Sequence, residues 1–344
     1  EQSDIQLNSL YERAGLGNIV GHEKRLGVIS RETRRRSAET RRQTSIRREQ
    51  ANMTVLDIIQ KSGEFLERKG VDSPRLQVEL ILEQVLKMPR LQLYVNFERP
   101  ITDNELDRLR DYVRRRGTRE PLQHILGSTS FCGLEIEVGR QALIPRPETE
   151  MLAERAWKFL NARIGSNSQL STQEQPSTVL ELGVGSGCIS VAIAVNSPTA
   201  QVTAIDLSDE AIELAGRNVR RHELADRVRL LKSDGFGQLP PGVQYDLIVS
   251  NPPYIPSGEI ETLQPEVRDH DPRAALDGGE DGLDFYRMLA EQASACLRPG
   301  GAMMLEFGDG QASVIGTIFK DTGWTVDAIV RDLADKERFI VLSR

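Results

Sequence analysis

Residues 178–187 read TVLELGVGSG, an apolar run that ends abruptly in a glycine-rich turn. Similar short, β-prone runs lie at residues 201–206, 227–232, 245–250, 301–307, 324–330 and 338–343. A helical pattern or a turn follows each of the first three runs, at the spacing typical of β-α-β units. Seven strands that alternate with helices predict a doubly wound α/β sheet with a mainly parallel core.

The carboxyl ends of the strands are the places where such a sheet binds its ligand. The first strand leads into Gly183-Val184-Gly185-Ser186-Gly187, whose glycines allow a ligand to come close to the backbone. Its third glycine comes too early for the dinucleotide spacing G-x-G-x-x-G, which argues against a nicotinamide cofactor. The turn is therefore a candidate site for another cofactor, and a plain tight turn is the alternative.

Acidic residues end the next two strands. Asp206 ends the second strand, where a carboxylate can accept hydrogen bonds from both hydroxyls of a ribose. Its alternative role is to cap the following helix, a role that Ser208 fills better. Asp234, Gly235 and Phe236 follow the third strand and offer a carboxylate and an aromatic face, although Asp234 alone could be a turn residue. Together these strand ends predict a nucleoside-binding site.

The fourth strand ends in Asn251-Pro252-Pro253-Tyr254, the most specific motif in the chain. Its two prolines fix the backbone, so that an Asn carbonyl and a proline carbonyl can accept both hydrogens of one planar –NH₂ group. This arrangement aims the nitrogen lone pair at an electrophile, while Tyr254 supplies a stacking wall. A structural turn is the alternative. We interpret Asn251, Pro252, Pro253 and Tyr254 as catalytic residues, with Asn251 also bordering the cofactor.

The composition is that of an ordinary soluble globular protein with about two domains. The 344 residues include 44 basic and 51 acidic side chains, a formal net charge of −7, and 39% hydrophobic residues. No apolar run approaches the roughly 18 residues of a membrane span, and no leader pattern is visible. Cys132, Cys188 and Cys296 are widely spaced, which argues against a disulfide framework or a zinc site. We expect a cytoplasmic protein without a metal ion.

Residues 1–52 differ from the rest of the chain in charge. The first 50 residues carry 11 basic and 7 acidic side chains, and residues 31–48 alone contain eight arginines. Such a segment has too little apolar surface to offset its chain entropy, so we expect a disordered or loosely helical extension. A solvated extension is favoured over an arm that binds nucleic acid. Because Met53 opens the first patterned segment, an upstream extension of the reading frame is a third interpretation.

Residues 53–126 show the pattern of a small helical domain. Apolar residues recur at helical spacing from Thr54, and Ser73-Pro74 resembles a helix start with a capping hydroxyl. Thr102 and Glu105 form a capping box before a further helix. Partial alternation predicts a β-hairpin at residues 127–138, in a linker that extends to 142. A helix follows the proline-rich segment 143–150, and the polar residues 161–177 are expected to form a surface connection.

From Met53 to Arg344 the chain resembles the release-factor glutamine methyltransferase family (PrmC/HemK). The strand-end motifs at 181–187, Asp206 and 251–254 carry the resemblance, together with the stretches PLQHILG at 121–127, LIPRPETE at 143–150, IP at 255–256, DPRAALDGG at 271–279, DGL at 281–283 and PGG at 299–301. Family members often carry an aromatic residue directly after the acidic residue of the third strand, whereas this chain has Gly235 there, with Phe236 following.

The resemblance implies an enzyme that takes a methyl group from S-adenosyl-L-methionine (SAM) and leaves S-adenosyl-L-homocysteine. It implies a class I methyltransferase fold at residues 143–344 with an antiparallel last strand, and a helical domain that helps to dock the protein substrate. That substrate is the glutamine of the Gly-Gly-Gln motif in class I peptide chain release factors, methylated at its side-chain amide nitrogen. Cofactor contacts are implied at residues 183–187, 206, 234–236 and 251.

Three rival functions share parts of this pattern. An adenine-N6 methyltransferase acting on nucleic acid also needs a site for a planar amine, but the acidic body offers no separate basic recognition domain. A methyltransferase acting on a glutamine of a ribosomal protein has the same chemistry and a different docking surface. A SAM-binding scaffold without catalysis is the least attractive, because the motif at Asn251–Tyr254 is intact.

Overall fold

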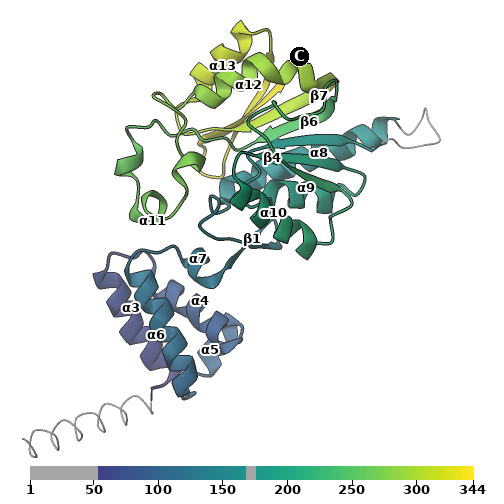
Figure 1. Ribbon diagram of the computed structural model, residues 1–344. Helices are drawn as coiled ribbons and strands as arrows, with labels where there is room; N and C mark the ends of the chain where they lie inside the picture. The colour runs from purple at the N-terminus through teal and green to yellow at the C-terminus, as the bar shows by residue number, and fades with distance from the viewer. Residues whose placement is uncertain (1–52, 168–175) are drawn as a thin grey trace, which may run out of the picture. The chain divides into compact units, whose positions relative to one another are not determined.

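A computed structural model describes residues 53–167 and 176–344 (Figure 1). Its main sheet has seven strands in the order β5-β4-β3-β6-β7-β9-β8. The strands are β3 (Thr178–Leu182), β4 (Gln201–Asp206), β5 (Val228–Lys232), β6 (Tyr245–Ser250), β7 (Leu297–Glu306), β8 (Thr325–Arg331) and β9 (Glu337–Ser343). All seven strands expected from the sequence are present, with ends shifted by a few residues, and the doubly wound α/β prediction is confirmed.

The pairing of the strands places β3 at the switch point of the sheet. β3 pairs in parallel with β4 on one side and with β6 on the other, and β4–β5 and β6–β7 are also parallel pairs. β9 runs antiparallel to both β7 and β8. The last strand is therefore antiparallel, as the family resemblance implies.

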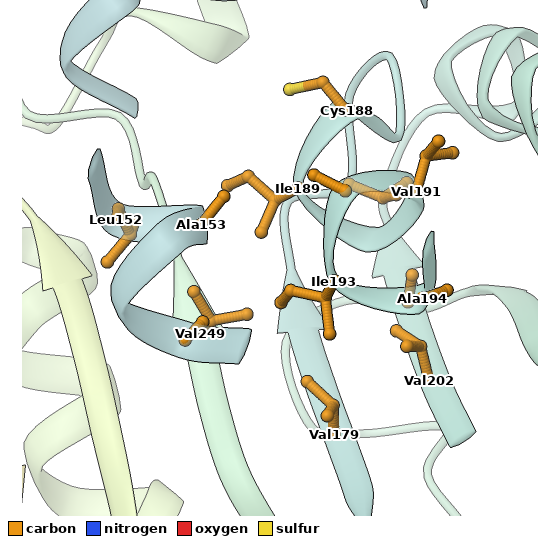
Figure 2. Packing of buried hydrophobic residues seen from close by; sticks show 14 of the residues in the cluster. Leu152, Ala153, Val179, Cys188, Ile189, Val191, Ile193, Ala194, Val202 and Val249 are labelled. Carbon is orange, nitrogen blue, oxygen red and sulfur yellow. The ribbon is translucent and has the colours of Figure 1, made fainter. Parts of the chain in front are cut away.

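Helices cover both faces of the sheet (Figure 1). One face carries α8 (Pro147–Asn167), α9 (Cys188–Asn196) and α10 (Asp209–Arg221), and the other carries α12 (Asp284–Gln292) and α13 (Ala312–Asp321). Figure 2 shows Leu152 and Ala153 of α8 above Val249 of β6, and Ile193 of α9 above Val179 of β3. Burial of such side chains on two faces gives the sheet its stability, at about 25 cal/mol for each Å² of apolar surface removed from water.

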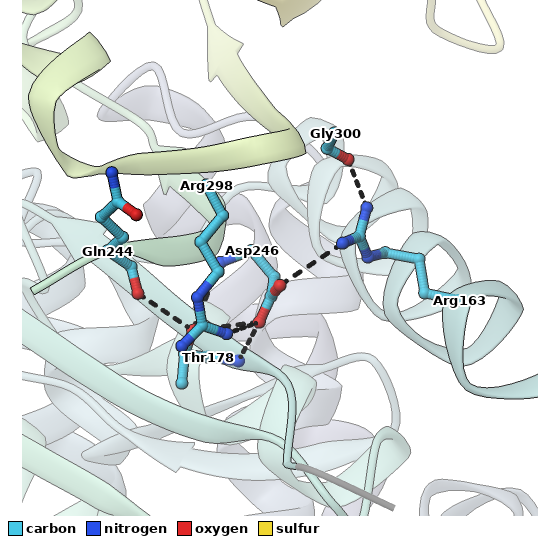
Figure 3. A network of polar contacts seen from close by, with 6 residues as sticks. All are labelled: Arg163, Thr178, Gln244, Asp246, Arg298 and Gly300. Atoms are coloured by element: carbon cyan, nitrogen blue, oxygen red, sulfur yellow. Dashed lines mark hydrogen bonds and ion pairs between the residues drawn. The ribbon is translucent and has the colours of Figure 1, made fainter. Parts of the chain in front are cut away.

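The amino ends of the central strands are joined by a polar network around Asp246 (Figure 3). Oδ2 of Asp246 accepts hydrogen bonds from the backbone N–H of Thr178 at 2.8 Å and from its hydroxyl at 3.0 Å. Arg298 donates to the same oxygen at 2.8 Å, and Arg163 of α8 lies 3.4 Å from Oδ1. The network ties β3, β6, β7 and α8 together at the edge opposite to the strand ends that carry the candidate site.

The helical segment contains α3 (Val55–Arg68), α4 (Pro74–Leu86), α5 (Arg90–Val95) and α6 (Asp103–Gly117). Thr54 and Asp57 form a capping box at α3, and the backbone N–H and hydroxyl of Thr102 reach Glu105 at 2.9 Å before α6. The prediction that the Ser73 hydroxyl caps a helix is wrong. Ser73 adopts a left-handed conformation with φ +48° and makes no side-chain cap hydrogen bond, so α4 begins on the fixed φ of Pro74.

The connecting segments confirm the hairpin and correct one boundary. β1 (Ser128–Phe131) and β2 (Leu134–Glu137) form a two-stranded antiparallel sheet, preceded by the short α7 (Leu122–Leu126). α8 continues to Asn167, so residues 161–167 are helical rather than part of a surface connection. The polar composition was misleading because a helix that is exposed on one face needs few apolar residues. Residues 168–175 and the arginine-rich residues 1–52 lie outside the described residues.

The chain forms two compact units, which divide between Val113 and Arg114 inside α6. The second unit contains the hairpin, the sheet and every strand-end residue discussed below. In the part of the chain that the structure describes, no helix is long and apolar enough to cross a membrane.

Candidate active site

The carboxyl ends of β4, β3 and β6 meet at one edge of the sheet. Leu182 of β3 is aligned with Ile205 of β4 and with Ser250 of β6. The hydroxyl of Ser250 donates to the carbonyl oxygen of Leu182 at 2.7 Å and ties the two strands together there. The residues that follow these positions are the glycine-rich turn, Asp206 and Asn251, so the register brings the predicted strand-end residues side by side.

The glycine-rich turn requires its glycines. Gly183, Gly185 and Gly187 have φ values of +73°, +51° and +79°, in the left-handed region that favours glycine. The backbone N–H groups of Gly183 and Val184 both donate to the carbonyl oxygen of Ile205 at 2.9 Å. A Cβ atom added to Gly183 would meet nothing within 4 Å. Open space therefore borders the turn, which suits the close approach of a ligand.

Asn218 of α10 holds the turn from the protein side. Its Nδ2 donates to the carbonyl oxygens of Ser186 at 2.8 Å and of Glu137 at 2.9 Å, and its Oδ1 accepts from the Glu137 N–H at 2.7 Å. A Cβ atom on Gly187 would lie 3.1 Å from Cβ of Ala215, so α10 packs closely here. Sequence reasoning missed Asn218, whose buried amide shows only as a polar residue on the apolar face of a helix.

Asp206 connects the turn to α10. Its Oδ2 accepts from the backbone N–H of Gly185 and its Oδ1 from that of Ser208, both at 3.0 Å. Ser208 is the N-cap of α10 and accepts from the backbone N–H of Ala211 at 3.2 Å. The cap role is thus filled by Ser208. The half-exposed Asp206 carboxylate keeps further lone pairs for a ligand.

The third strand end joins the same edge through its backbone. The N–H of Ser233 donates to the carbonyl oxygen of Asp206 at 2.9 Å. Asp234 is exposed, while the half-buried ring of Phe236 packs partly against the core of the α12–α13 face. Gly235 has φ +53°. Asp234 is therefore available to a ligand, and only part of the Phe236 ring is.

The turn after β6 is held by glycines and a glutamine. Nε2 of Gln311 donates to the Tyr254 carbonyl oxygen at 2.9 Å, and Oε1 of Gln311 accepts from the Gly308 N–H at 2.9 Å. A Cβ atom on Gly278 would lie 2.8 Å from the carbonyl oxygen of Pro253, and one on Gly282 would lie 2.4 Å from that of Tyr254. The segment 277–283 therefore fits against the turn only because these positions lack side chains.

The side-chain amide of Asn251 is anchored at its nitrogen. Nδ2 donates to Oγ1 of Thr149 at 3.1 Å, and the Thr149 hydroxyl donates to Oε2 of Glu306 at 2.7 Å. Thr149 belongs to the first turn of α8, and Glu306 ends β7. The Asn251 oxygen is thereby left as the end that is free to accept hydrogen bonds from another molecule.

Burial controls the charges around the site. It raises the pKa of the Tyr254 phenol to about 12, so Tyr254 stays neutral at physiological pH. It raises the pKa of Glu306 to about 7 and that of Glu181, which lies in β3 beside the glycine-rich turn, to about 8. Ser190 donates a short hydrogen bond to Glu181. These buried carboxyl groups titrate near neutral pH instead of near their usual values.

His124 and His222 do not give the site a general base. Burial lowers the pKa of His124 to about 4, and His124 lies in α7 rather than at a strand end. His222 contacts the carbonyl oxygen of Glu135 in the hairpin with Nε2 at 2.9 Å. Among the described residues no group of three His, Cys, Asp or Glu could hold a metal.

Sequence reasoning missed Thr149, Glu306 and Gln311. Thr149 lies inside a segment that stood out for its charges and prolines, and Glu306 ends a strand, so both carried a positional signal. Gln311 precedes α13, and nothing in its sequence position indicated a role in the site.

Two family models match this chain. A model of the PrmC N-terminal domain matches residues 57–127, and a model of the methyltransferase small domain matches residues 162–264. The release factor glutamine methyltransferase of Geobacter sulfurreducens is 46% identical over 272 residues, which cover 79% of this chain and 90% of that protein. The chain belongs to the release factor glutamine methyltransferase family.

Other members of this family match over a similar extent. The release factor glutamine methyltransferase of Chlorobaculum tepidum is 40% identical, over 78% of this chain and 91% of that protein. Among solved structures, a protein-(glutamine-N5) methyltransferase from Alicyclobacillus acidocaldarius is 32% identical, with a TM-score of 0.35 over 60% of this chain and 98% of that one. The resemblance seen in the motifs is confirmed by the relatives from Geobacter sulfurreducens and Chlorobaculum tepidum.

Proposed function

We propose that this chain transfers a methyl group from SAM to the side-chain amide nitrogen of the glutamine in the Gly-Gly-Gln motif of class I peptide chain release factors. The observation that carries the proposal is the amide of Asn251. Its nitrogen is bound by Thr149, which leaves its oxygen to accept from an –NH₂ group, in a chain that is 46% identical to a release factor glutamine methyltransferase.

The residues of the glycine-rich turn and its neighbours fit SAM. Asp206 offers fixed carboxylate oxygens for ribose hydroxyls, and the open space at Gly183 admits a ligand against the backbone. Asp234 and Phe236 would border the adenine, with Phe236 contributing an edge of its ring. Bound SAM supplies an electrophilic methyl group on a sulfonium. We assign Gly183–Gly187, Asp206, Asp234–Phe236 and Asn251 to this cofactor.

The turn at Asn251–Tyr254 orients the nucleophile. A carboxamide nitrogen is a weak nucleophile because its lone pair is delocalised into the carbonyl group. Oδ1 of Asn251 and the carbonyl oxygen of Pro252 would accept its two hydrogens and share the positive charge that develops on the nitrogen. Tyr254 remains a neutral phenol, so it acts as a wall and not as a base. The methylated nitrogen is acidic enough to lose its proton to water.

We assign the remaining parts of the chain on the same basis. Residues 53–126 would dock the release factor, and residues 143–344 would carry out the methyl transfer. Residues 127–142 would link these two parts. We expect the reaction in the cytoplasm, where a release factor meets the ribosome. Binding of nucleic acid is not part of the proposal.

Tritiated SAM with purified class I release factor tests the function. We expect label in the release factor with the wild-type protein and almost none with Asn251→Ala. Transfer RNA, DNA and ribosomal protein are parallel acceptors in the same assay. Label in a nucleic acid and not in the release factor would indicate an adenine-N6 methyltransferase instead. Label in ribosomal protein alone would indicate a ribosomal-protein glutamine methyltransferase.

A further inference from the structure

The orientation of the Asn251 amide decides whether the proposed site can work. An asparagine amide has one acceptor end and one donor end of almost the same shape. If the oxygen faces the substrate –NH₂ group, acceptor meets donor. If the amide rotates by half a turn, Nδ2 hydrogens face substrate hydrogens, and the substrate nitrogen is repelled. Some protein group must therefore select one of the two orientations.

Thr149 is the side chain that meets the amide. Its Oγ1 lies 3.1 Å from Nδ2 of Asn251 and 2.7 Å from Oε2 of Glu306. A hydroxyl has a single proton to donate. An ionised carboxylate only accepts, so the Thr149 proton goes to Glu306. Oγ1 can then only accept, which favours Nδ2 of Asn251 as its partner and disfavours Oδ1.

Glu306 is well placed to fix this direction. Thr149 is 2% and Glu306 3% exposed, so little water competes for their hydrogen bonds. The backbone around Glu306 is also held. Its carbonyl oxygen accepts from the Tyr286 hydroxyl at 2.7 Å, and its position in β7 is paired with Phe339 of β9.

The charges around Glu306 set its protonation. Burial raises the pKa of Glu306 to about 7, Glu148 at the start of α8 adds to the rise, and Arg338 of β9 and Arg146 oppose it. The neutral phenols of Tyr254 and Tyr286 also face it, and Glu306 contributes to raising the pKa of both. Glu306 is therefore mainly ionised above neutral pH and mainly protonated below it.

We propose that Glu306 and Thr149 are positioning residues that select the orientation of the Asn251 amide through the hydrogen-bond relay Glu306–Thr149–Asn251. The inference rests on the proposed function, because it assigns the orientation that a substrate –NH₂ group requires. When Glu306 is protonated, it can donate to Thr149, and the Thr149 proton becomes available to Oδ1 of Asn251. The relay then no longer distinguishes the two orientations.

Substitutions at Thr149 test the relay with little change in shape. Thr149→Val keeps the volume and loses the hydroxyl, whereas Thr149→Ser keeps the hydroxyl. We expect Thr149→Val to lower the single-turnover rate about 10- to 100-fold, because the Asn251 oxygen is then no longer held toward the substrate, and a misplaced group can cost up to about 100-fold. The Kd for SAM should change less than threefold. Thr149→Ser should restore the rate to within about threefold of wild type.

A control separates this effect from loss of a hydrogen-bonded threonine hydroxyl in general. Thr322→Val removes a hydroxyl that donates to the carbonyl oxygens of Ile318 and Phe319 at the end of α13, away from the strand ends. It should leave the rate unchanged. A folded Thr149→Val protein with the wild-type rate, or a Thr149→Ser protein as slow as Thr149→Val, would overturn the relay.

The pH dependence of the rate distinguishes the relay from a packing role, because a residue that only packs would not change it. The wild-type rate should fall as the pH drops through about 7, where Glu306 gains a proton. Glu306→Gln still offers an oxygen to Thr149 but cannot titrate, so its rate should be flat across this range. The same fall with pH in Glu306→Gln would overturn the assignment of Glu306.

A measurement without substrate distinguishes the relay from the proposed function. In protein labelled with ¹⁵N-asparagine, the Asn251 side-chain signals are those missing in Asn251→Ala. One Nδ2 proton should exchange slowly with water in wild type and Thr149→Ser, and fast in Thr149→Val. Fast exchange in all three would overturn the relay. A wild-type protein with the slow proton that leaves release factor unmethylated would overturn the proposed function instead.

Discussion

Gly185 donates its backbone N–H to Oδ2 of Asp206 at 3.0 Å, so the glycine-rich turn after β3 and the last residue of β4 share a hydrogen bond. The N–H of Ser208 holds the other carboxylate oxygen at the same distance. Both oxygens are thus fixed before any ligand binds. A preorganised acceptor loses little conformational freedom on binding, which favours affinity.

Removing the Asp206 carboxylate should therefore weaken SAM binding. Asp206→Ala loses the charged acceptor for the ribose hydroxyls and leaves the N–H of Gly185 without its partner. We expect a loss of about 3 kcal/mol, or roughly 100-fold in Kd, by calorimetric titration with SAM. Asp209→Ala removes an exposed neighbouring carboxylate and is the control. Equally small changes in the Kd for SAM in both variants would contradict the assignment of Asp206.

Asn251→Ala should separate chemistry from cofactor binding. The variant loses one of the two acceptors proposed to hold the substrate –NH₂ group, and loss of one such group commonly costs about 100-fold in rate. Because Asn251 borders the cofactor, its Kd for SAM should rise somewhat, but by far less than the rate falls. Single-turnover kinetics and calorimetry on the same protein measure the two effects. A loss of SAM affinity as large as that in Asp206→Ala would count against a catalytic role.

The sheet could be predicted from the sequence because its signals are local. Apolar runs such as 201–206 and 245–250 need no knowledge of their neighbours, and the glycines at 183–187 mark a turn that only glycine adopts easily. The chain order of the motifs then placed them at one edge of a doubly wound sheet. The family resemblance supplied the antiparallel direction of the last strand.

The supporting contacts could not be predicted because they depend on distant residues. Thr149 and Glu306 are 157 residues apart, and the contact between Gln311 and Tyr254 spans 57. The prediction of a helix cap at Ser73-Pro74 was wrong for a different reason. A serine before a proline matches a cap in sequence, yet the left-handed backbone at Ser73 directs its side chain elsewhere.

Gly282 should be required for the shape of the turn after β6. Gly282→Ala would bring a Cβ atom to 2.4 Å from the Tyr254 carbonyl oxygen at a φ of +76°, so the backbone must move. We expect the methyl-transfer rate to fall at least tenfold. Gly310→Ala has a similar φ of +82° with nothing within 4 Å, and should cost only about 1 kcal/mol of stability. Equal rates in the two variants would exclude the steric effect.

Glu181 should make stability depend on pH. Burial raises its pKa from 4.5 to about 8 in the folded state, so the folded protein binds more protons than the unfolded chain between these values. Its contribution to stability is present at low pH and is lost as the pH rises toward 8. We expect the melting temperature of Glu181→Gln, measured relative to that of wild type, to rise as the pH increases from 5 to 8.5.

The exposed Glu64 provides the control for this effect. Glu64→Gln makes the same substitution at an exposed position of α3 and is measured alongside at each pH. A difference between Glu181→Gln and wild type that is constant from pH 5 to 8.5 would show that Glu181 has the same proton affinity in the folded and unfolded states.

The position of the transferred methyl group tests the central claim most directly. Intact class I release factor is treated with the enzyme and SAM, and peptides are mapped by mass spectrometry. The proposed site would accept two hydrogens from one planar nitrogen, so we predict a methyl group on the side-chain nitrogen of the Gly-Gly-Gln glutamine. Release factor in which this glutamine is replaced by glutamate should gain none, because a carboxylate presents acceptors to acceptors. Methyl incorporation that persists in the glutamate variant would contradict the account.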